Sequence, residues 1–271
     1  MKTDMIFKEH GNDGLVYITA KNIKTVHAFT TRYGGVSEGI YESLNLRSNL
    51  GDDLDNVREN YRRLYDALDI PEGRLVASKQ VHGGTVRIVT EEDIVSPLEE
   101  FPVEADGMIT DAPNLPLIVY TADCIPILLH DPVRNIIGAV HAGWRSTAAG
   151  IAGEAVRKMV DVFDCEPKNI CAAIGPGIDF CCFETDVTVP KAMMELGLSG
   201  MEECIFPRGE KFHVDLKKIN AKILEKAGVK SSNIAISDEC TMCYNDKYWS
   251  HRYTGGKRGS QASIIMLKGN S

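Results

Sequence analysis

Hydrophobic residues are densest in the middle of the chain, between residues 117 and 150. Residues 117–119 with 125–129, and then residues 136–140, are rich in Val, Ile and Leu. Such runs are typical of strands that are covered on both faces. The first strand carries Asp123 and Cys124, and the second leads into His141. We therefore expect these two strands to form two sides of one pocket wall.

Helical spacing is clearest over residues 52–68. Apolar residues recur there every three or four positions, at Leu54, Val57, Tyr61, Leu64 and Leu68. This spacing predicts an amphipathic helix with acidic residues at its positive N-terminal end. The same reasoning predicts helices over residues 146–163 and 216–227.

Shorter apolar runs predict the remaining strands. They occupy residues 25–31, 170–174, 234–237 and 262–267. The Gly83-Gly84 pair between apolar residues predicts a hairpin over residues 75–89. No repeat, low-complexity segment or linker interrupts the pattern, so we expect residues 1–271 to form one domain.

Composition and charge narrow the classes of function. The chain has 271 residues, a formal net charge of -8 and a pI near 5.4. An acidic chain has no electrostatic reason to bind duplex nucleic acid or an anionic membrane. No run approaches eighteen apolar residues, and the first residues lack an apolar core of signal-peptide length. We expect a cytoplasmic protein with no nucleic-acid or membrane partner.

Eight cysteines are present, which suits free thiols rather than disulfides in a leaderless chain of this size. Cys240 and Cys243 form a C-x-x-C motif, but no second pair stands at zinc-ribbon spacing. We therefore expect plain thiols there. We likewise expect Cys181 and Cys182 to pack in the interior rather than to belong to a functional site.

His82, Cys124 and His141 are candidate metal ligands. Each stands at the end of a predicted strand or at a turn, and dozens of residues separate them. Three N and S ligands from different elements leave a fourth tetrahedral position open, which is the arrangement of catalytic zinc. Taken singly, a histidine is more often a hydrogen-bonded structural residue and a cysteine a core residue. Both interpretations stay open on spacing alone.

A candidate anion site follows the second central strand. Ser146 or Thr147 is expected to cap a helix there, beside Gly143 and Arg145. Free amides at a helix start beside an arginine suit phosphate or carboxylate. Arg32, next to a glycine pair, is a second candidate, although a plain turn with a solvated arginine fits those residues equally well.

Eight segments of the chain carry distinctive motifs. They are FTTRYGGVS (29–37), SLNL (43–46), KQVHG (79–83), DGMITDAPNLPLIVYTADCIPILLHDP (106–132), AVHAGWRSTAAGI (139–151), AAIGPGI (172–178), CCFE (181–184) and SHRYTGGKRGSQAS (250–263). These segments closely resemble the YfiH-like family, whose members have been named laccase-domain, polyphenol oxidoreductase or purine nucleoside phosphorylase proteins. The resemblance spans nearly the whole chain, in the family's order.

The resemblance implies an α+β fold with mixed β-sheets flanked by helices. It also implies that His82, Cys124 and His141 bind zinc or copper. The implied activities are phosphorolysis of adenosine, inosine and methylthioadenosine, together with deamination of adenosine. Asn45, in the SLNL segment, is then expected to bind substrate or phosphate. This chain departs from the family at Arg47, Asn49 and Ser146.

The expected partners are therefore purine nucleosides and inorganic phosphate; oligomeric state is not predicted. For deamination, the hypothesis is that metal-activated water attacks purine C6 while Asp123 moves protons. For phosphorolysis, Arg145, Ser146, Thr147 and Arg32 would hold the phosphate. Asp123, Cys124 and Arg145 are thus the expected catalytic residues.

Three other classes of function remain open. Two histidines, a cysteine and several methionines could form a copper oxidase site, but seven histidines are few for a multi-copper cluster. Cys124 could instead be the nucleophile of a metal-free hydrolase, with His82 or His141 as its base. A zinc-stabilised binding protein without turnover is the third alternative.

Overall fold

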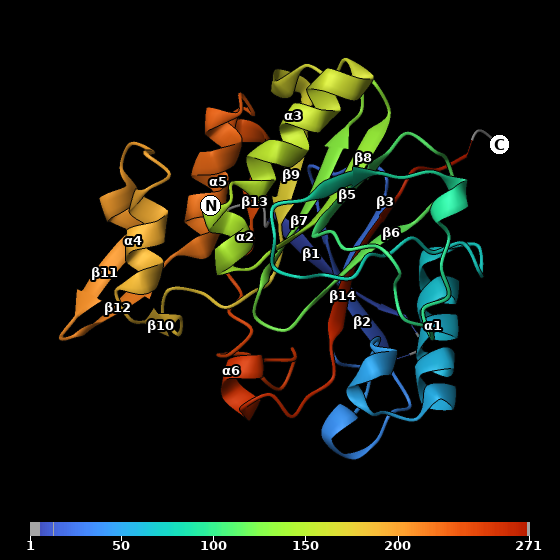
Figure 1. Cartoon of the computed structure of the whole chain (residues 1–271). Coiled ribbons are helices and arrows are strands. Elements are labelled where there is room, and N and C mark those ends of the chain that lie inside the picture. Colours follow the sequence, from blue (N-terminus) through green and yellow to red (C-terminus); the bar gives the residue numbers. More distant parts are fainter. Residues whose placement is uncertain (1–5, 13, 270–271) are drawn as a thin grey trace, which may run out of the picture.

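The computed structural model describes residues 6–12 and 14–269. Two large β-sheets pack face to face, and helices cover their outer faces (Figure 1). A small three-stranded sheet with α4 (Thr188–Met194) stands to one side. The prediction of an α+β fold with mixed sheets and flanking helices is confirmed.

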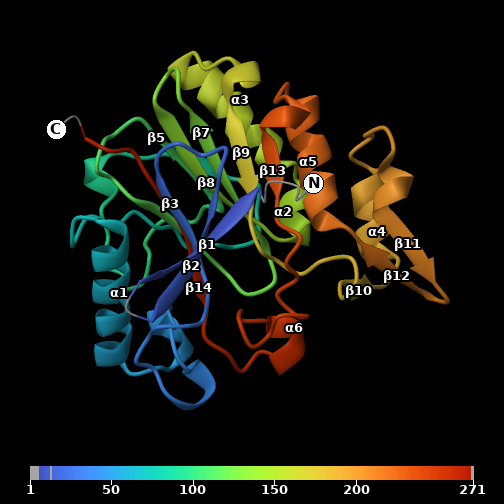
Figure 2. The same cartoon turned by 180° about the vertical axis from the view of Figure 1, so that it is seen from behind.

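The first large sheet has five antiparallel strands and lies in front in Figure 2. In spatial order they are β1 (Phe7–Asn12), β2 (Leu15–Ala20), β3 (Val26–Thr30), β14 (Gln261–Met266) and β6 (Leu117–Thr121). β14 therefore lies between β3 and β6, two strands from much earlier in the chain, and forms backbone hydrogen bonds with both.

The second large sheet has six strands and is mixed. In spatial order they are β13 (Ile234–Ile236), β9 (Cys171–Ile174), β7 (Ile125–Asp131), β8 (Ile136–Ala142), β5 (Gly107–Thr110) and β4 (Val86–Ile88). The pairs at its two edges are parallel and the inner pairs antiparallel. The small sheet has the order β10 (Glu184–Thr185), β12 (Lys211–Val214), β11 (Ile205–Arg208).

Three apolar clusters separate the layers. The central strands are buried at every position, and alternate residues supply opposite faces. In β7, Ile127 and Leu129 pack towards α3 (Ile151–Phe163) and α5 (Leu216–Lys226), whereas Leu128 packs between the two sheets. α1 (Leu54–Leu68) covers the outer face of the five-stranded sheet.

The predicted helix over residues 52–68 is confirmed as α1. Val57, Tyr61, Leu64 and Leu68 of its apolar stripe are buried, whereas Leu54 is exposed. The Asp53 side chain accepts a hydrogen bond from the Asp55 N–H at the start of the helix. Asp53 is therefore the N-cap of this helix. No helix among the described residues is both long enough and apolar enough to cross a bilayer.

Three local predictions are wrong. Residues 117–129 are not one strand, because β6 and β7 belong to different sheets. Residues 75–89 form no hairpin, since β4 pairs in parallel with β5 and residue Val76 bridges to Leu117. The helix after β8 begins at Trp144, as the five-residue α2 (Trp144–Ala148), so neither Ser146 nor Thr147 caps it.

Acid is expected to destabilise the fold through His130. Its side chain is buried, and Nδ1 accepts a hydrogen bond from the Lys24 N–H, which requires a neutral ring. Burial lowers the pKa of His130 to about 4. Since the folded pKa lies below the unfolded one, stability is full above pH ~6.5 and is lost as the pH falls towards ~4.

Urea unfolding at pH 7.5 and pH 5 measures this effect. The free energy of unfolding should fall by up to about 2 kcal/mol more in the wild type than in His130→Gln, since one pKa unit corresponds to about 1.4 kcal/mol. An equal pH dependence in the two proteins would assign the acid sensitivity to other groups, of which buried His27 is the first to test.

Candidate metal site and pocket

The structure brings His82, Cys124 and His141 together, as their placement in the sequence suggested. One ligand atom of each lies within 4.8 Å of the other two. The Cys124 Sγ atom is 3.7 Å from His82 Nε2. The two imidazole rings meet edge to face, with centroids 4.9 Å apart. The three side chains thus converge on one point from three separate segments.

Asp106 holds both histidines in place. Its buried carboxylate accepts hydrogen bonds from the backbone N–H groups of His82 and Gly83, at 2.9 and 2.7 Å. It also accepts one from His141 Nδ1 at 2.8 Å, which leaves His141 Nε2 to face Cys124. A carboxylate that orients a histidine in this way is the usual outer partner of a metal ligand.

The path of the backbone explains where Cys124 lies. Residues 122–124 cross from the end of β6 to the start of β7, and Asp123 takes a positive φ of 94° at this crossing. Together, His82, Cys124 and His141 form a trio of candidate metal ligands. At the end of β8, Gly143 packs against two of them, His82 and Cys124. A Cβ at Gly143 would stand 2.8 Å from His82 Cδ2 and 3.1 Å from Cys124 Sγ, so only glycine fits there without a shift.

Electrostatics at the trio favour an ionised thiol. Burial alone raises the pKa of Cys124, but the neighbouring imidazoles of His141 and His82 outweigh burial and lower that pKa to about 6. Burial in turn lowers the pKa of His141, while Cys124 and Asp106 outweigh it and raise that pKa to about 9. The thiolate is the form of cysteine that binds metals.

These residues fit a metal ion. Two imidazole nitrogens and one thiolate are the donors that zinc and copper accept in proteins. The ligand atoms face one another across a space bordered by glycine rather than by a larger side chain. His82 is exposed and Cys124 half-buried, so a fourth position is open to the pocket.

The trio stands at the wall of a pocket of about 350 Å³, a size suited to a small-molecule ligand. Its lining combines apolar and cationic side chains: His82, Ala122, Asp123, Cys124, Gly143, Trp144, Ile178, Phe183, Leu216, His251, Arg252 and Arg258. Burial lowers the pKa of Arg258, and the nearby carboxylate of Asp123 and thiol of Cys124 work against that shift. Arg258 Nε is buried and has no hydrogen-bond partner among the residues that the structure describes.

Asp123 lines the same pocket and is held from both sides. Its Oδ1 accepts a hydrogen bond from the Thr241 hydroxyl and its Oδ2 one from the Arg252 N–H, each at 2.7 Å. Its backbone carbonyl accepts a further one from the Ile178 N–H. Asp123 therefore fixes three pocket segments relative to Cys124.

The structure does not bring the predicted anion-binding residues of α2 to this pocket. Arg145 is exposed and its guanidinium stacks on the Trp144 ring, 4.3 Å from the centroid. Ser146 is buried, and the buried Thr147 hydroxyl accepts a hydrogen bond from Asn220. Successive helical residues point about 100° apart. Trp144 lines the pocket, whereas Arg145 lies on the Trp144 ring and is not among the lining residues.

Arg32 and Asn45 also lie outside the pocket lining. The Arg32 guanidinium donates to the carbonyls of Glu42 and Asn245 and stacks on Trp249. Asn45 is fully buried, donating to Asp52 and accepting from the Ser260 N–H. Both side chains hold loops together through contacts that occupy their polar atoms.

Sequence reasoning missed Asp106, Arg252 and Arg258. Asp106 opens the DGMIT run, and both arginines belong to SHRYTGGKRG, so all three lie inside segments that carry the family resemblance. The basic and glycine-rich stretch SHRYTGGKRG, which contains His251, could therefore have indicated a binding segment. Nothing in the sequence alone says that this stretch folds back onto Cys124, which precedes it by more than a hundred residues.

Comparison with known protein families gives one match over most of the chain. Residues 26–268 match the family described as multi-copper polyphenol oxidoreductase laccase. A purine nucleoside phosphorylase, YlmD, of Geobacillus stearothermophilus is 36% identical over 247 residues, covering 89% of each chain. A purine nucleoside phosphorylase of Deinococcus radiodurans is 36% identical over 254 residues, covering 94% of each.

Solved structures agree with this match. The structure of YlmD from Geobacillus stearothermophilus superposes with a TM-score of 0.90 at 34% identity, covering 98% of this chain and 100% of that one. The structure of the Bacillus licheniformis hypothetical protein YfiH also superposes with a TM-score of 0.90, at 32% identity, covering 96% of this chain and 99% of that one. The resemblance to the YfiH-like family is confirmed.

Proposed function

The chain belongs to the family described as multi-copper polyphenol oxidoreductase laccase, and, following the names of its relatives, we propose that it is a purine nucleoside phosphorylase. The substrates proposed are adenosine, inosine and methylthioadenosine, with inorganic phosphate as the second substrate. A second reaction, deamination of adenosine, is proposed at the same pocket. The eight free cysteines suit the reducing cytoplasm as its location.

One observation carries the proposal: a candidate metal trio and two arginines share one pocket. In this proposal His82, Cys124 and His141 hold a single ion, taken to be Zn²⁺. Such an ion supplies Lewis acidity at its open fourth position. Asp106 keeps the two histidines oriented for it.

In phosphorolysis, a phosphate oxygen forms a bond to ribose C1′ as the C1′–N9 bond breaks. The electron pair of that bond leaves with the purine, which then takes up a proton, and ribose 1-phosphate is the other product. Arg258 and Arg252 are proposed to bind the phosphate and orient it, because both are cationic and line the pocket. The apolar surfaces of Phe183, Ile178 and Trp144 suit the flat purine.

In deamination, water adds to purine C6 and ammonia leaves. Asp123 is the proposed residue for moving the proton, since it lines the pocket next to Cys124. The hydroxyl of Thr241 and the N–H of Arg252 hold its carboxylate still. The position of a general acid or base must be fixed in this way before its pKa matters.

Replacing Arg258 by alanine is expected to raise the KM for phosphate about thirtyfold. A hydrogen bond to a charged group contributes about 2 kcal/mol, which corresponds to this factor. Arg145→Ala is the matched control, since it removes the same charge from an exposed position outside the lining. Steady-state kinetics with varied phosphate measure both. A larger increase in the KM for phosphate in Arg145→Ala would indicate that the phosphate binds at α2 instead.

The proposed function itself is tested by product analysis. Purified protein is incubated with adenosine, with and without phosphate, before and after chelation. Adenine that forms only with phosphate supports phosphorolysis, and inosine that forms without phosphate supports deamination; both should disappear on chelation. Activity that survives the chelator would favour a Cys124 hydrolase. Copper-dependent phenol turnover without purine products would favour an oxidase.

A further inference from the structure

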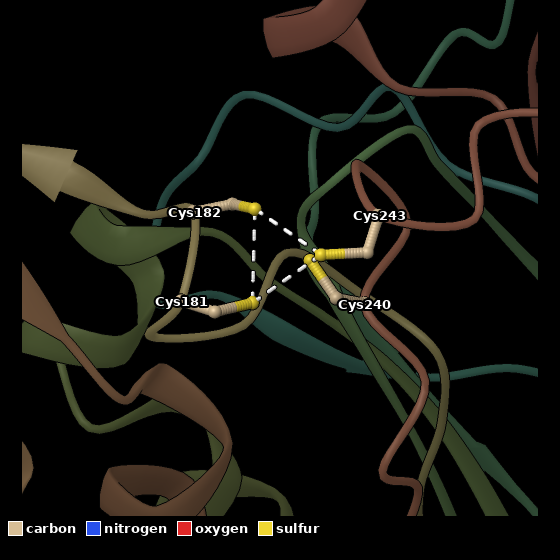
Figure 3. A group of neighbouring side chains, drawn as sticks. All are labelled: Cys181, Cys182, Cys240 and Cys243. Carbon is tan, nitrogen blue, oxygen red and sulfur yellow. Dashed lines mark hydrogen bonds between the residues drawn. The ribbon is translucent and has the colours of Figure 1, made fainter.

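A second group of metal-ligating side chains lies outside the trio. Cys181, Cys182, Cys240 and Cys243 point their sulfur atoms towards one another (Figure 3), and the four sulfurs lie within 4.8 Å of each other. The prediction that Cys181 and Cys182 pack in the interior is wrong for Cys181, whereas the prediction of plain thiols at Cys240 and Cys243 stays a prediction. Cys181 and Cys243 are exposed, and only Cys240 is buried. The two pairs are far apart in sequence, so spacing could not relate them.

The distances suit four ligands of one ion. Cys243 Sγ is 3.5 Å from Cys181 Sγ and 3.4 Å from Cys182 Sγ, and those two are 3.6 Å apart. Sulfur atoms at the corners of a tetrahedron around zinc stand about 3.8 Å apart, given a Zn–S distance of about 2.3 Å. All four cysteines are free.

The backbone around the C-x-x-C turn is arranged as it is around a bound thiolate. The Asp179 N–H donates to Cys240 Sγ at 3.3 Å, and the N–H groups of Met242 and Cys243 also donate to it. Several N–H donors on one sulfur stabilise negative charge there. A neutral thiol in an apolar interior has no need of them.

We propose that Cys181, Cys182, Cys240 and Cys243 form a structural Zn²⁺ site, separate from the site at His82, Cys124 and His141. Four thiolates with no open position are the ligand set of structural zinc. Sulfur ligands also favour zinc over harder ions such as Mg²⁺ and Ca²⁺.

The proposed ion would join a loop that lines the pocket to a second loop that contacts it. One loop follows β9 and carries Ile178 and Phe183 next to the cysteine pair; the other follows β13. Gly177 and Cys240 already form a β-bridge between the loops. Thr241, inside the C-x-x-C turn, donates its hydroxyl to Asp123. Losing the ion should therefore loosen the pocket without touching the trio.

Lys217 also connects the same two loops through hydrogen bonds. Its ammonium group is buried and donates to the Asp179 carboxylate at 3.1 Å, and to the carbonyls of Ser237 and Glu239 at 2.9 Å each. Asp179 precedes the cysteine pair by two residues, and Glu239 directly precedes Cys240. The buried ion pair of Lys217 and Asp179 therefore holds the two cysteine-bearing loops together.

Metal content of variants tests the proposal. The double variant His82→Ala/His141→Ala lacks the pocket ligands, so it should retain one zinc per chain where the wild type has two. Adding Cys240→Ser and Cys243→Ser to it should leave none. Cys171 is a half-buried cysteine outside both groups. Adding Cys171→Ser to the double histidine variant instead should still leave one zinc ion per chain. All proteins are purified in reductant, and folding is checked by circular dichroism.

Cobalt substitution provides a readout that does not depend on activity. In the double histidine variant, one Co²⁺ per chain should give the strong sulfur-to-cobalt charge-transfer absorption of four thiolates. Cys181→Ser, at an exposed position, should fold, keep three thiolates and show a weaker band. A folded double histidine variant that holds neither zinc nor cobalt would overturn the proposal. A mass deficit showing disulfides among these cysteines in freshly reduced protein would do so too.

Discussion

Cys124→Ser is expected to lower kcat/KM for phosphorolysis about a thousandfold and to empty the pocket metal site. Serine keeps the shape of the side chain but not the thiolate, whose pKa the adjacent imidazoles hold low. Two histidines alone bind zinc weakly. Metal ions contribute several kcal/mol to transition-state stabilisation, and about 4 kcal/mol corresponds to this factor.

Kinetics with inosine and phosphate, together with zinc content, measure the effect. Cys171→Ser is the control, since it makes the same exchange in β9, away from the pocket lining. The control should keep full activity. If Cys124→Ser lost activity but kept its pocket zinc, Cys124 would act as a nucleophile rather than as a ligand. The alternative of a hydrolase would then be favoured.

Asp106→Ala is expected to weaken zinc binding at the trio about 100-fold, although Asp106 does not touch the ion. Removing the outer partner of a metal-bound histidine typically costs 10–100-fold in affinity. Here one carboxylate serves two ligands, because it holds the His82 backbone and the His141 ring. It also accepts from the N–H groups of Val81 and Gly83, which would lose their buried acceptor.

Competition with a zinc chelator measures the affinity. Asp111→Ala is the matched control, because it removes an exposed carboxylate from the segment that follows β5. The zinc affinity of Asp106→Asn should lie between those of Asp106→Ala and Asp111→Ala. An amide keeps one acceptor oxygen, but its N–H groups face the N–H donors that the carboxylate accepted from. An affinity in Asp106→Ala equal to that of the wild type would show that the histidines are positioned by packing alone.

Sequence reasoning succeeded where the signal is local. The helix predicted over residues 52–68 follows from the spacing of its apolar residues. The central strands follow from their apolar runs, and His82, Cys124 and His141 were placed together by their positions at element ends. The family resemblance added the fold.

Several of the errors concern contacts between distant segments. A run from residue 117 to 129 does not reveal that its halves enter different sheets. The C-x-x-C motif at Cys240 does not reveal that Cys181 and Cys182 lie opposite it. Nor does the sequence show that Arg258, rather than Arg145, lines the pocket. Each outcome depends on sheet order, which periodicity does not report.

The order of the five-stranded sheet has a consequence for biosynthesis. β14 supplies the hydrogen-bonding partner of both β3 and β6, yet it is translated after every other strand of that sheet. Until residues 261–266 leave the ribosome, a nascent chain presents the edges of β3 and β6 unpaired. Such edges attract other strands. The five-stranded sheet can therefore be completed only after β14 has been synthesised.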